Sequence, residues 1–235
     1  LLYAEGGSIM ATLYQSNTND GRASNYAVLS WVDTRIMTTS GQSSSTNTVE
    51  MNLTQRFSGR GAIVTSITRI FFEFDTSGIS VAPTAGNLKI YGAYSRTDSD
   101  VILVRSTQSG AVVAADFDAL YNASTELAAS DGANGGTLDG ISGLKYSSVV
   151  SSWTTSGYND FPLTADALSD MASLDAFACC IMNHSYDFRD IAPSLDTTVG
   201  AGVTMSNYTG TSRDPYIDYT PATAAADNAV FFGAN

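Results

Sequence analysis

Basic side chains are scarce in this 235-residue sequence, which carries a formal net charge of −12. Lys89 and Lys145 are its only lysines, so the salt-bridged faces that stabilise exposed helices have few cations to use. A protein that binds nucleic acid must neutralise phosphates with Lys and Arg. The acidic balance therefore argues against a nucleic-acid partner and is typical of charge that keeps a protein in solution.

Cysteine and histidine are also scarce. Cys179 and Cys180 are adjacent in an apolar run, and adjacent side chains of a strand point to opposite faces, so we expect two buried free thiols rather than a disulfide. The sole histidine, His184, excludes a multi-histidine metal site. No Gly-x-Ser-x-Gly motif offers it a nucleophile, so we interpret it as a surface-loop residue.

Long apolar runs are missing as well. No run approaches the roughly 18 apolar residues of a membrane span, so we expect no membrane insertion. Polarity comes instead from Ser, Thr, Asn, Asp and Gly, and the 20 Gly and 5 Pro favour short strands joined by many turns.

One segment, 69–79, shows this pattern most clearly. Ile70, Phe72 and Phe74 fall on one side of a period-2 strand, which predicts that a second layer covers that side. Asp75 begins a turn of Asp, Thr, Ser and Gly that ends the strand. We interpret these residues as core and turn, with no ligand.

The whole chain shows roughly ten to twelve such strands, which predicts an all-β fold: an antiparallel β-sandwich or jelly roll with one or two short helices. Thr164 is expected to N-cap a helix over 165–173. The other expectations are strands at 25–37, 149–153 and 177–182, a helical turn within 114–121, an exposed loop at 38–48 and a turn at 56–61. No linker divides the chain, so we expect one domain over 1–220 and a C-terminal tail over 221–235.

No catalytic pattern emerges, and we expect no enzyme activity. Pairs of carboxylates such as Asp98/Asp100, Asp116/Asp118 and Asp187/Asp190 resemble glycosidase acids, but 23 acidic residues produce such pairs by chance. We interpret them as solvated turn residues.

We expect no cofactor and assign no metal ligands. The sequence leaves a structural calcium ion open, because the Gly-rich loop with Asp131, Asn134 and Asp139 offers hard oxygen ligands. Asp98, Asp100 and Asp187 offer the same chemistry elsewhere. The spacing is not that of an EF-hand.

Sugar binding requires exposed aromatic faces beside polar groups. Trp31, Trp153 and Tyr158 are the glycan-binding candidates, because Trp153 ends an expected strand and Tyr158 lies in an expected turn. Packing in the core or at the rim of a sandwich is the alternative for each of them, and the more common one.

Several segments follow sequence patterns that occur together. The first is the strand and turn Arg69–Ile79, similar to the pattern R-x-hydrophobic-x-F-D-T-S-x-I, followed by a strand at 86–91. The next are 100–107 and 113–118, similar to V-x-S-T followed by A-x-D-[FY]. The last is 208–219, which is similar to a closing strand with the pattern G-T-S-x-x-P. Together these segments resemble a jelly-roll-like domain of tailed-phage virion structural proteins, and the match covers about 25–220.

The resemblance implies a non-enzymatic sandwich, made in the host cytoplasm and carried on the virion as a capsid decoration, fibre or tail component. Its expected partners are other virion proteins or further copies of itself in a homo-oligomer. Val230, Phe231 and Phe232 in the apolar tail are candidate assembly contacts. Because related sandwiches occur as carbohydrate-binding modules, the alternative is such a module or a receptor-binding head that recognises a host-surface glycan.

Overall fold

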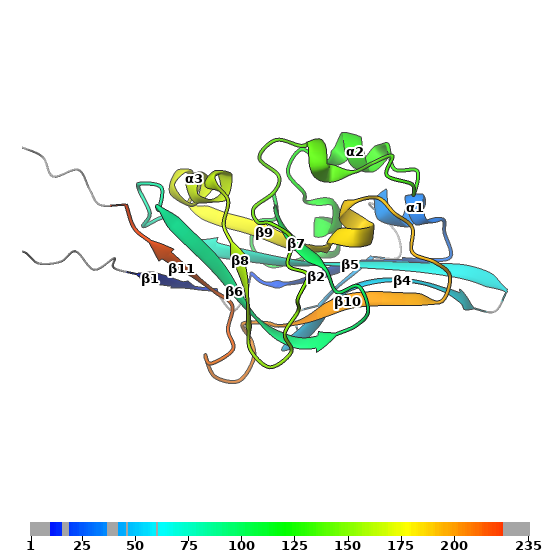
Figure 1. Ribbon diagram of the computed structural model, residues 1–235, viewed down its shortest axis with the longest axis horizontal. Helices are drawn as coiled ribbons and strands as arrows, with labels where there is room; N and C mark the ends of the chain where they lie inside the picture. The colour runs from blue at the N-terminus through cyan, green and yellow to red at the C-terminus, as the bar shows by residue number, and fades with distance from the viewer. Residues whose placement is uncertain (1–9, 16–18, 37–41, 46, 60, 223–235) are drawn as a thin grey trace, which may run out of the picture.

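The computed structural model describes residues 10–15, 19–36, 42–45, 47–59 and 61–222, and antiparallel strands dominate this part of the chain (Figure 1). The strands are β1 (Ala11–Tyr14), β2 (Gly21–Ala27), β3 (Gln42–Ser45), β4 (Val49–Gly59), β5 (Ala62–Asp75), β6 (Ala85–Ser95), β7 (Val101–Arg105), β8 (Tyr158–Pro162), β9 (Ala176–Asn183), β10 (Thr197–Thr204) and β11 (Tyr216–Thr220). They pair in the order β1-β11-β6-β10-β4-β5-β2-β3, with β8 beside β6 and β9 between β5 and β7.

β5 is the central strand of this arrangement. Its first part pairs with β4 and β2, and its last six residues pair with β9. Ile70, Phe72 and Phe74 are fully buried on one face, as the period-2 pattern predicts. Phe71, on the other face, is fully buried too. Both faces of the strand are therefore covered, whereas the sequence indicated a cover on one.

On the face of β5 that carries Ile70, Phe72 and Phe74, the strands β5 and β9 pack against a second layer made by β6, β8 and β11. The core between the two layers contains Ile70, Phe72 and Phe74 together with Leu88, Ile90, Phe161 and Ile217. α3 (Ala165–Ser173) adds Ala167 and Met171 to the same core. This arrangement confirms the expected all-β, sandwich-like fold.

On the opposite face of the sheet, which carries Phe71 and Cys180, short helices and loops cover β5 and β9. These helices are α1 (Trp31–Ile36), η1 (Ala114–Asp118), α2 (Ser124–Ala128), η2 (Leu138–Gly140) and η3 (His184–Phe188). Phe71 and Cys180 from the sheet pack there with Phe117, Leu127 and Phe188. Figure 1 shows α1 and α2 above the strands. We call this part the helical layer, and only its helical turn at 114–118 was expected from the sequence.

The expected strand over 25–37 is wrong beyond Ala27, because α1 begins at Trp31. Ser30 caps this helix: its Oγ accepts a hydrogen bond from the Asp33 backbone N–H at 3.1 Å, and its carbonyl accepts one from Thr34. A helix also places Trp31 and Arg35, four residues apart, on one face, and both are buried.

Three other local expectations differ from the structure. The segment 38–48 contains β3, whose backbone pairs with β2 without needing apolar side chains. The predicted turn at 56–61 is too early, since β4 continues to Gly59. The segment 149–153 forms no strand, and Val150 makes only an isolated bridge to Val101.

The expectations with a local physical cause are confirmed. Thr164 Oγ1 accepts a hydrogen bond from the Ala167 N–H at 3.3 Å, and α3 has the predicted bounds. Cys179 and Cys180 lie on β9 as buried free thiols, and burial raises the pKa of both, so they stay protonated. The Asp75 carboxylate accepts hydrogen bonds from the Ser77 N–H and hydroxyl, which forms the turn after β5.

Candidate binding surface

The outer face of the β1, β11, β6 and β8 layer carries a continuous row of aromatic side chains. Alternation places Leu13, Ile217 and Leu88 in or against the core, so their neighbours along each strand point outward. A loop between β10 and β11 adds two more side chains. We call this surface the tyrosine face, and it consists of Tyr14, Tyr91, Tyr158, Tyr208, Tyr216 and Arg213.

Strand register brings the rings of this row together. Tyr14 lies opposite Tyr216 across β1 and β11, and their ring centroids are 5.7 Å apart. Tyr216 contacts Tyr158 at 5.0 Å, and Tyr158 contacts Tyr91 at 5.4 Å, both edge to face. These separations are typical of favourable aromatic pairs, so each ring fixes the position of the next.

Arg213 extends the row through two cation–π contacts. Its guanidinium carbon lies 4.7 Å from the ring centroid of Tyr91 and 4.8 Å from that of Tyr208. The Tyr158 hydroxyl donates a hydrogen bond to the Ser212 carbonyl at 3.0 Å, which holds the loop against the strands. Burial raises the pKa of Tyr158 to about 12, so this hydroxyl is protonated at neutral pH.

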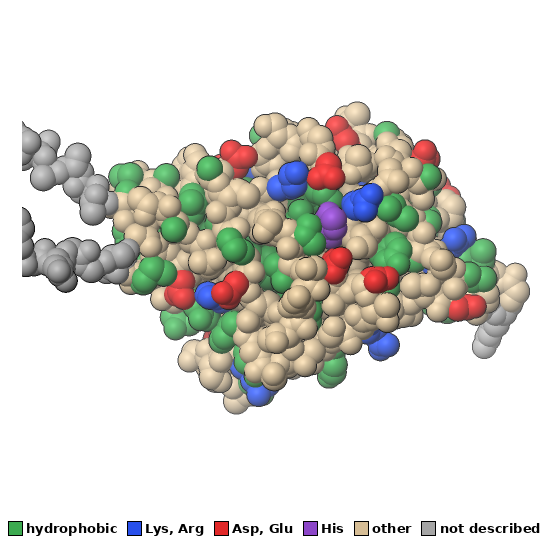
Figure 2. Space-filling model, in the orientation of Figure 1, with side chains coloured by type: hydrophobic (Ala, Val, Ile, Leu, Met, Phe, Trp, Pro, Cys, Tyr) green, Lys and Arg blue, Asp and Glu red, His purple; other side chains and the backbone are tan. Residues whose placement is uncertain are grey.

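Tyr14 is 59% exposed, which makes it the most accessible ring of the row. Charged side chains lie beside the rings. Lys89 on β6 and Asp160 on β8 form an ion pair at 2.7 Å on the same outward side. Figure 2 shows basic, acidic and hydrophobic side chains intermingled at the lower left of the molecule, over this layer. The surface therefore offers aromatic rings and hydrogen-bonding groups side by side.

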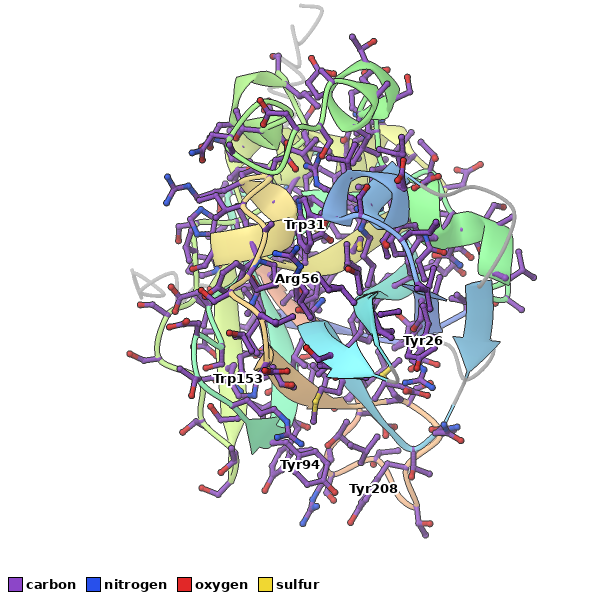
Figure 3. The ribbon with its side chains drawn as sticks, turned by 90° about the vertical axis from the view of Figure 1, so that its right-hand side faces the viewer. Tyr26, Trp31, Arg56, Tyr94, Trp153 and Tyr208 are labelled. Atoms are coloured by element: carbon purple, nitrogen blue, oxygen red, sulfur yellow. The ribbon has the colours of Figure 1, made fainter. Side chains whose placement is uncertain are left out.

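Two of the three glycan-binding candidates lie in the interior (Figure 3). Trp31 is 3% exposed and its Nε1–H donates to Asp190 at 2.9 Å. Trp153 is 9% exposed and donates to the Gly202 carbonyl at 3.2 Å. Neither indole presents an exposed face, because each belongs to a core and has an internal partner for its N–H. Tyr158 alone of the three belongs to the tyrosine face.

The rest of the row was not singled out from the sequence. Its signal was the alternation of tyrosine with an aliphatic residue, as in Leu13-Tyr14, Ile90-Tyr91 and Tyr216-Ile217. Alternation alone cannot show that these strands are neighbours. The candidate assembly contacts Val230, Phe231 and Phe232 lie outside the described residues.

Under the helical layer, a network of buried charges joins distant segments. Arg69 of β5 is fully buried and binds the Asp187 carboxylate with two hydrogen bonds of 2.8 Å. It also donates to the Phe117 carbonyl at 2.7 Å and stacks on that ring at 4.0 Å. Arg35 of α1 donates to the Asp187 carbonyl and the Gly136 carbonyl, both at 2.8 Å. The network thus fixes α1, η1 and η3 to the sheet.

Asp190 completes this network and shapes the Gly-rich loop considered for calcium. Its carboxylate accepts hydrogen bonds from the backbone N–H groups of Asp131 and Gly136, at 2.9 and 2.8 Å. Asp131 Oδ1 accepts from the N–H groups of Ala133 and Gly135. The carboxylate pair Asp187/Asp190, predicted to be solvated, is instead buried and engaged in structure. No group of three or more His, Cys, Asp or Glu within the described ranges is placed to hold a metal ion.

His184, the sole histidine, lies on η3 with its ring stacked on that of Phe188, at 5.6 Å between centroids. Burial lowers its pKa, so the ring is neutral at pH 7. Nearby, Tyr186 and Asn183 hold the turn at Asp98 through hydrogen bonds of 2.9 and 3.0 Å. These contacts fix the local loop structure.

Comparison with known proteins adds no relative: no family model matches the chain, and no curated protein matches its sequence. In the described part of the chain, no helix is both long and apolar enough to cross a membrane.

Proposed function

We propose that this protein is a non-enzymatic structural component of a phage virion, which contacts a neighbouring surface through its tyrosine face. The observation that carries the proposal is the partly exposed row of rings with its arginine. The resemblance of five segments to tailed-phage structural proteins supports the virion as the setting.

Tyrosine and arginine are the side chains that protein contact surfaces use most efficiently. Tyrosine combines a large apolar ring with a hydroxyl, and it loses little conformational entropy on binding. In the tyrosine face, edge-to-face packing and the Tyr158–Ser212 hydrogen bond already restrain the rings. Such preorganisation lowers the entropic cost of association.

A second candidate function is recognition of a host-surface glycan by the same face. The observation that favours it is the Lys89–Asp160 pair on the outward side of the same two strands as Tyr91 and Tyr158. A sugar ring can pack its C–H groups on an aromatic ring while its hydroxyls bond to charged groups beside it. The two candidate functions use the same surface but differ in what binds there: a neighbouring virion surface in the first and a glycan in the second.

Mass spectrometry of purified particles and of cleared supernatant from the producing culture tests the virion setting. The protein should co-purify with particles in a fixed ratio to the major capsid protein. Its presence in the supernatant alone would reject the proposal.

The role of the face is tested with the double variant Tyr14→Ala/Arg213→Ala. We expect a loss of at least tenfold in incorporation into particles, because the double variant removes the most accessible ring and the cation of the face, and aromatic and arginine side chains contribute most to contact surfaces. Tyr26→Ala is the matched control, since Tyr26 is 53% exposed and lies on β2, outside the tyrosine face (Figure 3). Normal incorporation together with lost glycan-array binding would favour the second candidate, and no change in either would reject the face as a contact.

A further inference from the structure

The edge strand β1 differs from the other edge strands of the protein. In the described part of the chain, β3, β7 and β8 also lie at edges. β8 contains Asp160 and Pro162, β3 consists of Gln and Ser, and residues 144–150 cover β7, where the Tyr146 N–H donates to the Leu103 carbonyl at 2.9 Å. Charge, proline and a covering segment all prevent a sheet from adding a strand. β1, with the sequence Ala-Thr-Leu-Tyr, has no charge, no proline and no described segment over its edge.

The free side of β1 presents backbone groups that can pair with a further strand. The Gln15 N–H donates to the Pro215 carbonyl at 3.1 Å, and alternation along the strand turns the N–H and C=O of Leu13 toward β11 as well. The N–H and C=O groups of Thr12 and Tyr14 therefore point away from β11, to a side where no described strand lies. Both residues are exposed. Such an edge is a template for strand addition.

Apolar surface accompanies these backbone groups. Leu13 lies opposite Ile217 across β1 and β11, and both side chains point toward the core between the layers. Ile217 is fully buried, whereas Leu13 at the edge is only partly buried. A strand added to β1 would place alternate side chains beside Leu13 and cover it. The edge thus offers hydrogen bonds and apolar contact together.

The chain itself contains a segment of matching chemistry, residues 229–232, which lie outside the described residues. Their sequence is Ala-Val-Phe-Phe, which is uncharged and rich in residues that favour strands. The register pairs Ala11 with Tyr219, so the chain leaves β11 at the end where it enters β1 (Figure 1). Residues 221–228 precede the segment and, fully extended, span about 25–30 Å. This length is sufficient to reach a neighbouring molecule.

A second copy suits the edge better than the tail of the same molecule. A tail that turns back directly after β11 runs parallel to β1, and parallel pairing is the less stable kind. The tail of a second copy is free to pair in the antiparallel direction. Two copies that exchange their tails in both directions form a closed, symmetric dimer.

We propose that the free edge of β1 binds residues 229–232 of a second copy as an added antiparallel strand. Thr12 and Tyr14 supply two backbone donors and two acceptors, and Leu13 supplies apolar contact. The contact joins copies through the edge of the layer and not through its outer surface. It therefore goes beyond the proposed role of the tyrosine face, and either proposal can fail without the other.

The first test uses the unchanged full chain over a wide range of concentration. Sedimentation velocity should show a dimer that dissociates on dilution. Hydrogen exchange followed by mass spectrometry should show slow exchange of residues 10–15 in the dimer and fast exchange in the monomer, because only the dimer pairs the amides of Thr12 and Tyr14. A chain that is monomeric at every concentration would overturn the proposal. If residues 10–15 were protected in that monomer, the occupant would be the molecule's own tail.

Substitutions then test each side of the contact. Thr12→Pro removes an N–H that points away from β11 and so leaves the pairing with β11 in place. It should raise the dissociation constant of the dimer about tenfold or more, because an interstrand hydrogen bond is lost and its acceptor is left unpaired. Thr12→Val is the matched control, since it keeps the N–H and removes only the hydroxyl that donates to Asp218 at 2.8 Å. It should dimerise like the wild type.

The variant Val230→Ser/Phe231→Ser/Phe232→Ser tests the tail and should also be monomeric where the wild type is a dimer. It leaves every described residue unchanged, so it decides the matter if Thr12→Pro fails to fold. A wild-type level of dimer in this tail variant would reject residues 229–232 as the occupant. The same level of dimer in a folded Thr12→Pro variant would reject the edge of β1 as the contact.

Discussion

Two of the arginines that stack on aromatic rings, Arg69 and Arg213, lie in opposite environments. Arg69 lies 4.0 Å from the centroid of Phe117 with no exposed side-chain surface, and two hydrogen bonds tie it to Asp187. Arg213 lies 4.7 Å from the centroid of Tyr91 at the partly exposed tyrosine face. In the described ranges Arg213 has no carboxylate in ion-pair contact.

The difference separates what holds the fold from what is available for binding. A guanidinium in the interior loses its hydration and must recover that energy from fixed acceptors. Arg69 finds them in η1 and η3, so its ring contact is part of the structure of the helical layer. Arg213 remains partly hydrated, and its contacts position a cation where another molecule can reach it.

The largest expected effect on stability is at Arg69, the buried arginine of the two. Arg69→Met should lower the free energy of unfolding by about 3–5 kcal/mol, because it leaves the Asp187 carboxylate buried without its partner. Arg213→Met is the matched substitution at the surface and should cost no more than about 1 kcal/mol. Denaturant unfolding of both variants measures the difference. Similar losses would mean that the buried network does not hold the helical layer.

A smaller effect is expected at Asp190, and it depends on pH. Burial opposes ionisation of this carboxylate, but hydrogen bonds from Ser130 and Trp31 and the charge of Arg35 outweigh it, so the pKa lies below 3.8. A lowered pKa in the folded state stabilises the fold above the unfolded pKa, and this contribution is lost as pH falls through the folded value. Asp190→Asn should therefore cost about 1–3 kcal/mol at pH 7.

The cost of Asp190→Asn should shrink as the pH falls below about 3.8, the ordinary value for Asp. Urea unfolding of wild type and variant at pH 7, 5 and 3 checks this. A constant difference at all three values would show that the charge of Asp190 contributes nothing.

The sequence predicted the parts of the fold that depend on a side-chain cap or on apolar periodicity within one segment. Thr164 and the residues after it specify a helix through one side-chain cap and one apolar face, and the structure has that helix unchanged. Ile70, Phe72 and Phe74 specify a strand with a covered face, and they lie in the sandwich core. Ser30 was an equally good cap, but the surrounding Tyr, Val and Leu favour strands, and this bias concealed α1.

Contacts between distant segments could not be predicted in the same way. Arg69 is buried only because Asp187, 118 residues away, meets it under the helical layer. The same holds for the tyrosine face, where Tyr14 and Tyr216 come from opposite ends of the chain. Tyr158 was identified as a candidate because the sequence predicts a polar turn there, although the structure makes it the first residue of β8. Its partners in the row became visible only through strand order.

The smallest expected effect is at the exposed pair on the tyrosine face. A double-mutant cycle with Lys89→Met and Asp160→Asn should give a coupling energy of about 0.2–1 kcal/mol in low salt, because both side chains reach water and are partly exposed. In about 1 M salt the coupling should fall toward zero, since screening then acts over roughly 3 Å.

The same cycle on Arg69 and Asp187 should keep most of its coupling, because salt cannot enter a fully buried site. Coupling at the exposed pair that survives high salt would mean that the tyrosine face is a rigid part of the fold, and a weaker candidate for a surface that adapts to a partner.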